Sequence, residues 1–323
     1  MRRECGIYYF CYSHNRPTGG QKETYKHVDI LNASGYQAFA VHTAKGFRLT
    51  WFENRTKTVH FDEFRRIFNQ EQDYIVLPED LGSKILNFPG KKVIFNKGIY
   101  NGFVSFGDKK PPVYPYHHPE VICVLTVSDH NSEHLRFAYP NLDVIRVYPG
   151  IDSDLFAYKP LREKRQCITY VPKSLPALLS LYHTLQSRAE AGINKLKEYD
   201  WILLHDRSEQ DVATILRDSL IFIFLSVEEG LPQTVLEAMS CGCLVAGYGS
   251  GPLRECLPPG FQFEHGDLIG IAKYIEAITD SFPHRVKDWE ALAVAGYKKA
   301  LYYSPERQRA SVLEAWDRIL RRR

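Results

Sequence analysis

The sequence predicts an α/β protein that folds as two doubly wound domains, each built around a parallel sheet. Short apolar runs of strand length alternate with helical patterns along the chain, which indicates repeated βαβ units. The length of 323 residues, of which 44% are hydrophobic, exceeds what one typical core accommodates. Two domains of about 150 residues each are therefore expected.

The first half of the chain contains apolar runs that we predict to be strands. Continuous apolar runs are typical of strands that are buried on both faces of a parallel sheet. A helix is predicted at residues 21–33, where Gly35 closes the pattern. The predicted strands cover residues 7–12, 38–42, 74–77, 93–95, 121–127 and 144–147.

The second half repeats the alternation and ends in helices. A turn cluster at residues 148–152 and a polar stretch at residues 156–164 separate the two halves. We therefore predict one domain at residues 1–150, a second at residues 151–303, and a helix at residues 304–323 that packs back on the first domain. The predicted strands are 168–171, 201–205, 220–225 and 244–246, and the predicted helices are 175–191, 210–217, 268–279, 289–301 and 306–320.

The overall charge, the cysteines and the lack of a long apolar window disfavour several classes of protein. A formal charge of +3 gives no support for sequence-specific binding of nucleic acid. The seven cysteines lie mostly in apolar runs, which favours reduced, buried thiols in a cytoplasmic protein. No window reaches the ~18 apolar residues of a membrane span, so we expect neither membrane insertion nor secretion.

Residues 226–249 form the most informative segment. Apolar runs precede and follow a helical pattern here, which predicts a strand, a loop, a helix and a second strand. Glu229 then lies in the loop at the carboxyl end of the first strand, where open α/β sheets bind ligands, and Glu237 lies on the helix. Pro232 suits the first turn of that helix, and Gly242 suits its end.

Two carboxylates beside a helix start suit the binding of a sugar nucleotide. The free backbone N–H groups at the helix start favour an anion such as a diphosphate. Ionised carboxylates accept hydrogen bonds, and the hydroxyl groups of a sugar or ribose donate them. The alternative is structural, with Glu229 as a helix cap and Glu237 as a solvated helix residue.

Residues 229–242 read E-G-L-P-Q-T-V-L-E-A-M-S-C-G. This run closely resembles the donor-site motif of retaining glycosyltransferases of the GT-B fold, in the family-4-like group 1 that includes glycogen-synthase-like enzymes and mannosyltransferases. The resemblance implies two Rossmann-like domains that face each other across a cleft. It also implies that Glu229 touches the transferred sugar and that Glu237 binds the ribose. The residues between them would meet the diphosphate: Gly230, Leu231, Pro232, Gln233 and Thr234.

Gly19 and Gly20 follow the first predicted strand and open a helix, so the backbone there can approach a phosphate or sugar closely. The resembling family has a Gly-Gly pair in this loop. A plain loop before a helix would look the same. The chain contains no G-x-G-x-x-G sequence, which disfavours an enzyme that uses nicotinamide.

Lys173 ends the first strand of the second half. In the resembling enzymes a basic residue here, and a Lys several residues later, neutralise the diphosphate as the glycosidic bond breaks. Residues 174–186 contain neither Lys nor Arg, so this role falls to Lys173 alone or to a residue such as Arg207. Arg207 lies where family members form the nucleobase pocket; alternatively it belongs to a helix entry with Ser208 as its cap.

The resembling enzymes commonly have a His after the fourth strand of the first domain. Here residues 93–98 read V-I-F-N-K-G and contain no His. Asn96 is expected to hold a donor hydroxyl. Asn96, Lys97 and Tyr100 are expected to form the acceptor side of the site.

Two other clusters have structural interpretations. His117 and His118 lie between prolines and fit a loop pair of partly exposed histidines. Asp152 and Asp154 mimic the D-x-D of metal-dependent glycosyltransferases, but their surroundings resemble the interdomain linker of the GT-B family. We therefore expect no metal and no other cofactor.

The sequence thus leads to the hypothesis of a retaining hexosyltransferase with Glu229 and Lys173 as catalytic residues. It would move a hexose or deoxyhexose from a UDP or GDP sugar to a glycan or lipid-linked glycan acceptor. We expect a cytoplasmic protein that makes transient contact with the inner membrane surface and binds no nucleic acid. Two alternatives stay open: a nucleotide-sugar epimerase of the same architecture, and a non-catalytic assembly partner that retains the fold.

Overall fold

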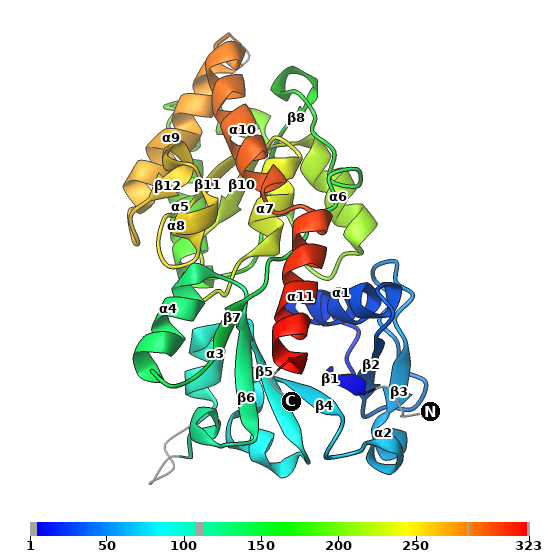
Figure 1. Cartoon of the computed structure of the whole chain (residues 1–323). Helices are drawn as coiled ribbons and strands as arrows, with labels where there is room; N and C mark the ends of the chain where they lie inside the picture. The colour runs from blue at the N-terminus through cyan, green and yellow to red at the C-terminus, as the bar shows by residue number, and fades with distance from the viewer. Residues whose placement is uncertain (1–4, 107–112, 283, 322–323) are drawn as a thin grey trace. The chain divides into compact units, whose positions relative to one another are not determined.

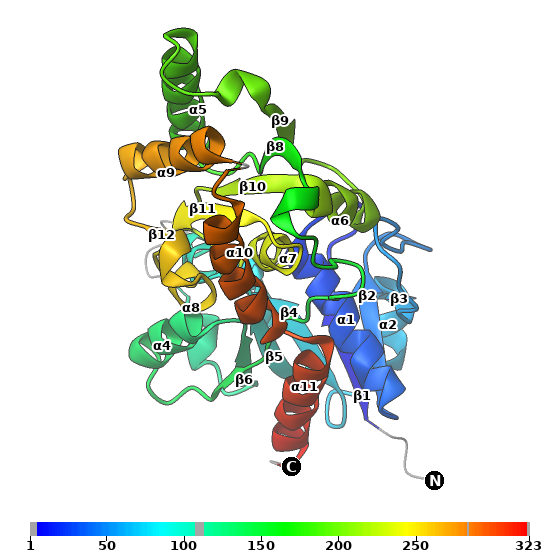
Figure 2. The same ribbon diagram turned by 90° about the horizontal axis from the view of Figure 1, so that it is seen from above.

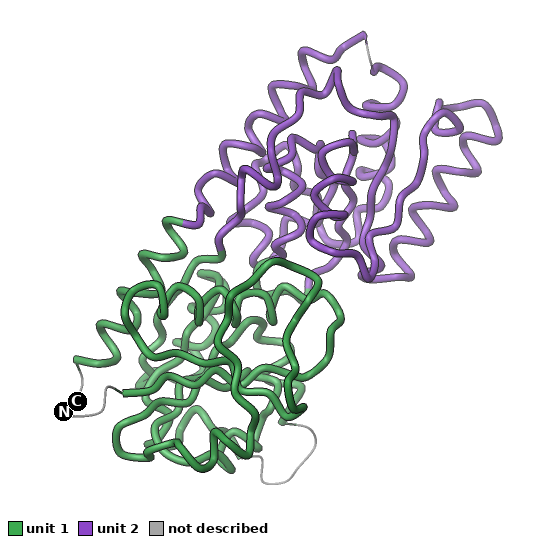
Figure 3. The backbone as a smooth tube through the Cα atoms, turned by 90° about the vertical axis from the view of Figure 1, so that its right-hand side faces the viewer, with its two compact units in different colours: residues 1–149, 228–231, 306–323 green, residues 150–227, 232–305 purple. Residues whose placement is uncertain are grey.

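The computed structural model describes residues 5–106, 113–282 and 284–321. The chain divides into two compact units (Figure 3). Unit 1 comprises Met1–Pro149, Glu228–Leu231 and Glu306–Arg323, and unit 2 comprises Gly150–Val227 and Pro232–Pro305. The short segment Glu228–Leu231, which the sequence assigned to the second domain, thus groups with unit 1.

Unit 1 is built around a sheet whose described strands are all parallel and follow the order β3-β2-β1-β4-β5-β6-β7 (Figure 1). The strand order reverses between β1 and β4, which makes this point the topological switch of the sheet. The strands are β1 (Gly6–Phe10), β2 (Gln37–His42), β3 (Thr58–His60), β4 (Tyr74–Pro78), β5 (Lys91–Asn96), β6 (Val121–Thr126) and β7 (Val144–Arg146).

Helices cover this sheet because its strands are apolar on both faces. Every residue of β4 is buried, as a parallel strand between two helical layers requires. The helices of unit 1 are α1 (Gly19–Ala33), α2 (Phe61–Ile67), α3 (Ile99–Val104), α4 (Asp129–Ala138) and α11 (Pro305–Leu320), with 3-10 turns η1 (Glu79–Asn87) and η2 (Pro115–His117).

The strands predicted in the first half are all present, and the predicted helix at residues 21–33 is α1. The structure adds β3, which the sequence analysis missed. Only Val59 is apolar in this three-residue strand, so it gives no apolar run of strand length.

The C-terminal helix α11 completes the core of unit 1. Trp316 is fully buried, and its Nε1–H donates a hydrogen bond of 2.9 Å to Tyr9 Oη on β1. Gln308 Nε2 donates to the Glu23 carboxylate on α1, and Tyr36 Oη donates to Asp317. Residues near the two ends of the chain therefore belong to one core.

Unit 2 is built around a smaller sheet, whose described strands are parallel and follow the order β12-β11-β10-β8-β9. All strands predicted in this half are present. The sequence analysis missed β12, which has only two residues. The strands are β8 (Arg165–Tyr170), β9 (Asp200–Leu203), β10 (Ser219–Phe224), β11 (Leu244–Tyr248) and β12 (Gln262–Phe263).

The helices of unit 2 agree with the predicted ones within a few residues and add α8. Figure 2 shows α5 beside α9, and these two helices are joined by a two-pronged ion pair between Arg188 and Glu276 at 2.6 and 3.0 Å. The helices are α5 (Leu175–Glu190), α6 (Glu209–Asp218), α7 (Gln233–Ser240), α8 (Leu253–Cys256), α9 (Leu268–Ser281) and α10 (Val286–Leu301), with 3-10 turns η3 (Leu161–Glu163), η4 (Leu196–Glu198) and η5 (Pro259–Phe261).

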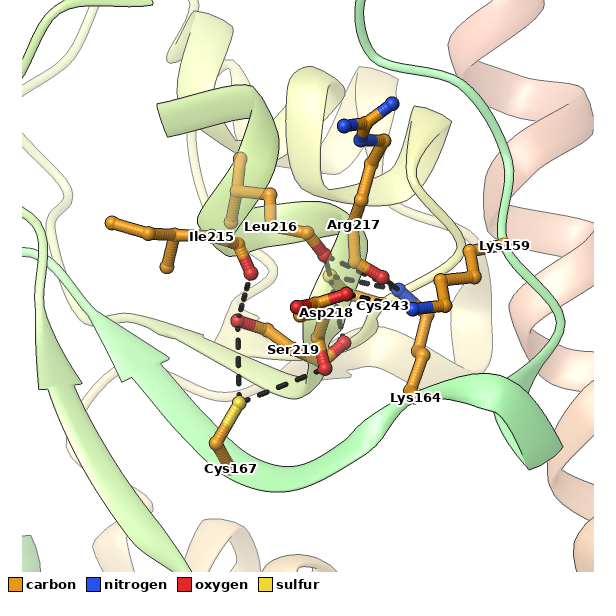
Figure 4. Close-up of polar contacts among 9 residues, drawn as sticks. All are labelled: Lys159, Lys164, Cys167, Ile215, Leu216, Arg217, Asp218, Ser219 and Cys243. Atoms are coloured by element: carbon orange, nitrogen blue, oxygen red, sulfur yellow. Dashed lines mark hydrogen bonds and ion pairs between the residues drawn. The ribbon is translucent and has the colours of Figure 1, made fainter. Parts of the chain in front are cut away.

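A buried lysine satisfies the end of α6 (Figure 4). Lys164 Nζ donates to the carbonyl oxygens of Leu216 at 3.2 Å and Arg217 at 2.9 Å. The last carbonyls of a helix lack partners within the helix and carry partial negative charge, so an ammonium group stabilises them. Lys159 adds an ion pair of 2.7 Å with Asp218 at the same helix end.

The cysteines are reduced thiols, as expected, and all but Cys5 are buried. Burial raises the pKa of Cys11 to about 12 and the pKa of Cys243 to about 11. Thiolate is therefore scarce at neutral pH, and the buried thiols should be inert.

We predict that a thiol reagent such as DTNB modifies only Cys5 rapidly in the native protein at pH 8. All seven cysteines should react once the chain is unfolded in guanidinium chloride. The measurement is the absorbance of released thionitrobenzoate per chain. Rapid reaction of three or more thiols in the native protein would contradict the burial of the cysteines other than Cys5.

We predict that Trp316→Ala lowers the free energy of unfolding of the protein by about 3–5 kcal/mol, because it leaves a large cavity and removes one hydrogen-bond donor to Tyr9. Urea denaturation followed by far-UV circular dichroism measures this change. Phe137→Ala is the matched control, because Phe137 is 89% exposed. Equal midpoints for the two variants would show that α11 does not support unit 1.

Candidate functional site

Several polar residues of unit 1 lie at the carboxyl edge of its sheet. Parallel strands all end at the same edge, and ligands of open α/β sheets bind there, at the switch point. Glu79 follows β4, and Asn96 ends β5 with Lys97 directly after it. Cys11 follows β1 on the other side of the switch point.

Gly19 and Gly20 form the first turn of α1, as the sequence predicts. No described side chain caps this helix start, because the Thr18 hydroxyl donates instead to Gln21 Oε1 at 3.1 Å. A Cβ added to Gly20 would lie 2.9 Å from Cε of Lys97, so the backbone of Gly20 packs directly on the lysine stem. The first N–H groups of α1 are thus available to an anion.

Asn96 supports the loop after β5 and is fully buried. Its Nδ2 donates to Tyr116 Oη at 3.1 Å, and its Oδ1 accepts a hydrogen bond of 3.3 Å from Asn131 Nδ2. Tyr100, on α3, is 40% exposed. Of the three residues predicted for the acceptor side, Asn96 therefore holds the loop in place, whereas Lys97 and Tyr100 reach the surface.

The segment Glu228–Leu231 and the loop after β5 meet within unit 1. Gly230 is buried, and a Cβ added to it would overlap the carbonyl oxygen of Lys97 and lie 3.0 Å from Cγ2 of Val127. A clash with backbone cannot be relieved by a side-chain rotation. Only glycine therefore fits at position 230 in this arrangement.

The structure describes the surroundings of both glutamates. The N-cap of α7 is Pro232, one residue earlier than predicted for a first-turn proline, and Pro232 makes no side-chain cap. Glu229 is half-buried and lies three residues before this N-cap. Glu237 is only 5% exposed, so it is not a solvated helix residue. Gly242 follows the end of α7 with φ of +80°, which confirms its predicted role.

The carboxyl edge of the sheet of unit 2 carries two unusual backbone conformations. Ser174 and Asp206 both have φ of +49°, and they are the described non-glycine residues in the left-handed region. Each follows a strand, β8 and β9 respectively, and these strands are neighbours. Such conformations cost of order 1–3 kcal/mol and cluster at functional sites.

Each of these strained residues adjoins a predicted donor-binding residue. Lys173 precedes Ser174 and is exposed, with its backbone N–H bonded to the carbonyl of Val171 at 2.8 Å. Arg207 follows Asp206 and is also exposed. Ser208 caps α6 by accepting a hydrogen bond of 3.1 Å from the N–H of Asp211, so the helix-entry interpretation of this loop is confirmed.

The two remaining clusters are structural, as predicted. Asp152 Oδ1 accepts hydrogen bonds from the N–H groups of Asp154 at 3.0 Å and Leu155 at 3.1 Å, which closes a turn. His117 is exposed and His118 half-buried, in a short loop turn. Within the described ranges, no group of three His, Cys, Asp or Glu side chains is placed to hold a metal ion.

The sequence analysis did not identify Glu79, a charged residue of unit 1. Glu79 is only 3% exposed, and its Oε2 lies 3.5 Å from Nζ of Lys97. Burial raises the pKa of the Glu79 carboxyl, and the nearby Lys97 ammonium opposes this effect. An acidic residue directly after a buried strand, at the carboxyl edge of the sheet, was the signal that could have found it.

The fold is shared with known glycosyltransferases. Sucrose-phosphate synthase from Thermosynechococcus elongatus is similar, with 11% identity, a TM-score of 0.71 and coverage of 99% of this chain and 100% of that chain. The pneumococcal O-GlcNAc transferase in complex with UDP and GlcNAc has 8% identity and a TM-score of 0.67, with 99% of both chains covered. An alpha-glucosyltransferase in complex with UDP and a 13-mer DNA has 12% identity and a TM-score of 0.63, with 98% of this chain and 99% of that chain covered. The GT-B fold expected from the sequence is confirmed.

A comparison of the sequence with protein families gives a second, independent result. Residues 181–281 match the family described as "Glycosyl transferases group 1", and this region contains the segment from Glu229 to Gly242. The match and the fold together indicate a transferase enzyme of the glycosyltransferase class. A search of curated proteins finds no match to the sequence. None of the described helices is both long and apolar enough to cross a membrane.

We predict that Gly230→Ala lowers the free energy of unfolding by about 1–3 kcal/mol, because the new methyl group overlaps the backbone of Lys97. Urea denaturation measures the change. Gly98→Ala is the control, because the atom nearest to its added Cβ lies 3.5 Å away and its φ of −176° suits any residue. Equal stability of the two variants would show that Gly230 does not lie against the backbone of Lys97.

Proposed function

We propose that the protein transfers a hexose or deoxyhexose from a UDP sugar to a hydroxyl group of a glycan or lipid-linked glycan, with retention of anomeric configuration. The observation that carries the proposal is the start of α7. It combines a helix start whose N-cap residue, Pro232, makes no side-chain cap with a half-buried Glu229 earlier in the chain and a buried Glu237 within the helix. Its place in the region that matches group 1 transferases supports this assignment.

The donor would be bound by complementary charges and hydrogen bonds. The N–H groups at the start of α7 bind the diphosphate, together with Lys173 at the end of β8. The Glu237 carboxylate accepts hydrogen bonds from the ribose hydroxyls, and Glu229 accepts from the transferred sugar. Arg207 lies at the nucleobase end.

The chemistry would proceed by attack of the acceptor hydroxyl on the same face of the sugar that the diphosphate leaves. The bond from C1 to the diphosphate oxygen breaks, its electron pair goes to the diphosphate, and the acceptor proton goes to a diphosphate oxygen. Fixed positive charges that meet the developing negative charge supply the stabilisation, so the reaction needs no metal. The sequence singles out no nucleophile for a covalent intermediate, which favours this single-step route.

The choice of UDP rests on two similar glycosyltransferases that are described in complex with UDP. A GDP sugar is the alternative donor. A glycan acceptor is favoured over DNA, although one similar enzyme is described with DNA, because the chain has a formal charge of only +3. Work at the cytoplasmic membrane surface would follow from a lipid-linked acceptor.

We predict that UDP or GDP raises the melting temperature of the protein, because a ligand of the native state stabilises it. Thermal denaturation at millimolar nucleotide, followed by a panel of nucleotide sugars, measures the shift and ranks the donors. If neither UDP nor GDP at millimolar concentration shifts the melting temperature, the proposed function is wrong. NMR of the donor alone with enzyme checks for epimerase activity: clean inversion at C2 without an acceptor would replace the transferase.

We predict that Glu229→Gln lowers kcat at least about 10²-fold and leaves the melting temperature unchanged, because it removes a charge that interacts with the transferred sugar in the transition state. Release of UDP or GDP from the preferred donor measures turnover. Glu228→Gln is the matched control, because Glu228 is the adjacent, exposed carboxylate. Unchanged turnover in Glu229→Gln would remove the central assignment.

A further inference from the structure

The loop that joins β1 to α1, residues 11–18, is exposed at its tip but is held in one shape. Gln21, in the first turn of α1, is 5% exposed. Its Nε2 donates to the carbonyl oxygens of Tyr12 at 2.8 Å and His14 at 3.1 Å. Its Oε1 accepts a hydrogen bond of 3.1 Å from the Thr18 hydroxyl. One buried amide thus ties both ends of the loop to the helix.

A second set of hydrogen bonds ties the same loop to the segment after β2. The Asn15 amide donates to Thr50 Oγ1 at 2.7 Å and accepts from the Thr50 N–H at 3.0 Å. Ser13 Oγ accepts from the N–H groups of Thr43 at 3.0 Å and Ala44 at 3.2 Å. Fixing a loop costs conformational entropy, and a site that is already rigid avoids this cost when a ligand binds. A loop fixed on both sides, at the sheet edge where ligands bind, therefore favours a role in binding.

The loop presents two aromatic rings with nearly parallel planes. The centres of the Tyr12 and His14 rings lie 6.3 Å apart, and their planes differ by 16°. Phe10 packs edge-to-face on Tyr12 with 5.7 Å between the ring centres, and Phe88 packs in the same way on Phe10 at 5.5 Å. His14 is exposed and Tyr12 is half-buried. Apolar rings therefore support an aromatic pair that is partly open to solvent.

A carboxylate lies beside this ring pair. Tyr12 Oη donates to Asp80 Oδ1 at 2.8 Å, and Asp80 is exposed at the start of η1, just after β4. Burial, with a smaller effect of the Asp80 charge, raises the pKa of the Tyr12 hydroxyl, so this group stays protonated as a donor. Within the described ranges, Tyr12 is the hydrogen-bond donor that reaches Asp80. A carboxylate has about four acceptor positions, so Asp80 can accept further hydrogen bonds from a ligand.

Two aromatic rings beside a carboxylate match the chemistry of an uncharged sugar residue. The C–H groups on one face of a sugar ring carry partial positive charge and pack favourably on the negative face of an aromatic ring. The hydroxyl groups of the sugar donate hydrogen bonds to a carboxylate. An anionic ligand is disfavoured, because the charge of Asp80 repels it.

We propose that Tyr12, His14 and Asp80 bind an uncharged sugar residue at the switch point of the sheet of unit 1. The sugar ring packs on the two aromatic rings, and its hydroxyl groups donate to Asp80. The identification of this sugar as part of the acceptor rests on the proposed function. The site adds the β1–α1 loop and the start of η1 to the acceptor side, which the sequence analysis placed after β5.

The test measures the binding of simple sugars to the intact protein by saturation-transfer-difference NMR at millimolar ligand. The probes are the methyl glycosides of glucose, galactose, mannose, N-acetylglucosamine, fucose and rhamnose. Uridine is added, because a nucleobase also stacks on aromatic rings. The variants are His14→Ala, His14→Phe, Tyr12→Phe and Asp80→Asn. His183→Ala and Asp62→Asn are matched controls, because both residues are exposed. Melting temperatures show which variants are folded.

We expect at least one glycoside to bind the unmodified protein. His14→Ala should weaken its binding about threefold, through the loss of one aromatic contact. Asp80→Asn should weaken it about tenfold, the size of one charged hydrogen bond. His14→Phe should retain the affinity, because packing needs a ring and not an imidazole nitrogen. Tyr12→Phe should lose part of the affinity, because the ring remains but Asp80 loses the donor that orients it. The two controls should bind as the unmodified protein does.

The outcomes separate this inference from the proposed function. If no glycoside binds the unmodified protein, or if uridine alone binds, the sugar site is wrong. If His14→Ala and Asp80→Asn are folded and keep the full affinity, the sugar binds elsewhere and the assignment is wrong. The thermal shifts with UDP and GDP decide the proposed function separately. Sugar binding without nucleotide binding would leave the sugar site and remove the transferase, and nucleotide binding without sugar binding would do the reverse.

Discussion

The parallel arrangement of strands in both sheets decides where this protein can carry chemistry. Parallel strands all end at one edge, and their two faces are covered by helices, so polar residues collect at the carboxyl edge. Glu79 and Lys97 follow neighbouring strands of unit 1, and Lys173 and Arg207 follow neighbouring strands of unit 2. The apolar interior of the sheets thus concentrates the charged groups in a few loops.

Two lysines show how differently the fold balances an ammonium group at a helix end. Lys164 is buried and donates to the last carbonyls of α6, where the dipole is negative, so its charge is satisfied by the backbone (Figure 4). Lys97, whose side chain is 19% exposed, lies against the first turn of α1, where the dipole is positive, and its anionic partner Glu79 is 3.5 Å away. Backbone carbonyls thus balance the first ammonium group, whereas a carboxylate side chain balances the second.

Sequence periodicity and one motif were enough to predict most of the fold and the class of enzyme. Apolar runs predicted every strand of four residues or more, because strands covered on both faces must be apolar. The sequence analysis missed β12 because it has only two residues, and it missed β3 because only Val59 of its three residues is apolar. Glu79 escaped for another reason: its importance depends on Lys97, which is distant in sequence, and no local pattern reports that pairing. The hydrogen bonds of Asn96 to Tyr116 and Asn131 likewise join residues that are distant in sequence, so no local pattern predicts them.

The return of α11 to unit 1 also sets the order in which the protein can be completed during synthesis. The hydrogen bond from Trp316 to Tyr9 joins residues 307 positions apart. A ribosome delivers the N-terminal residues first, so the strands of unit 1 must wait for almost the whole chain before their last apolar surface is covered. Until α11 has been synthesised, the nascent first unit exposes the apolar surface that Trp316 covers in the folded protein. A truncated chain that lacks α11 would leave this surface exposed.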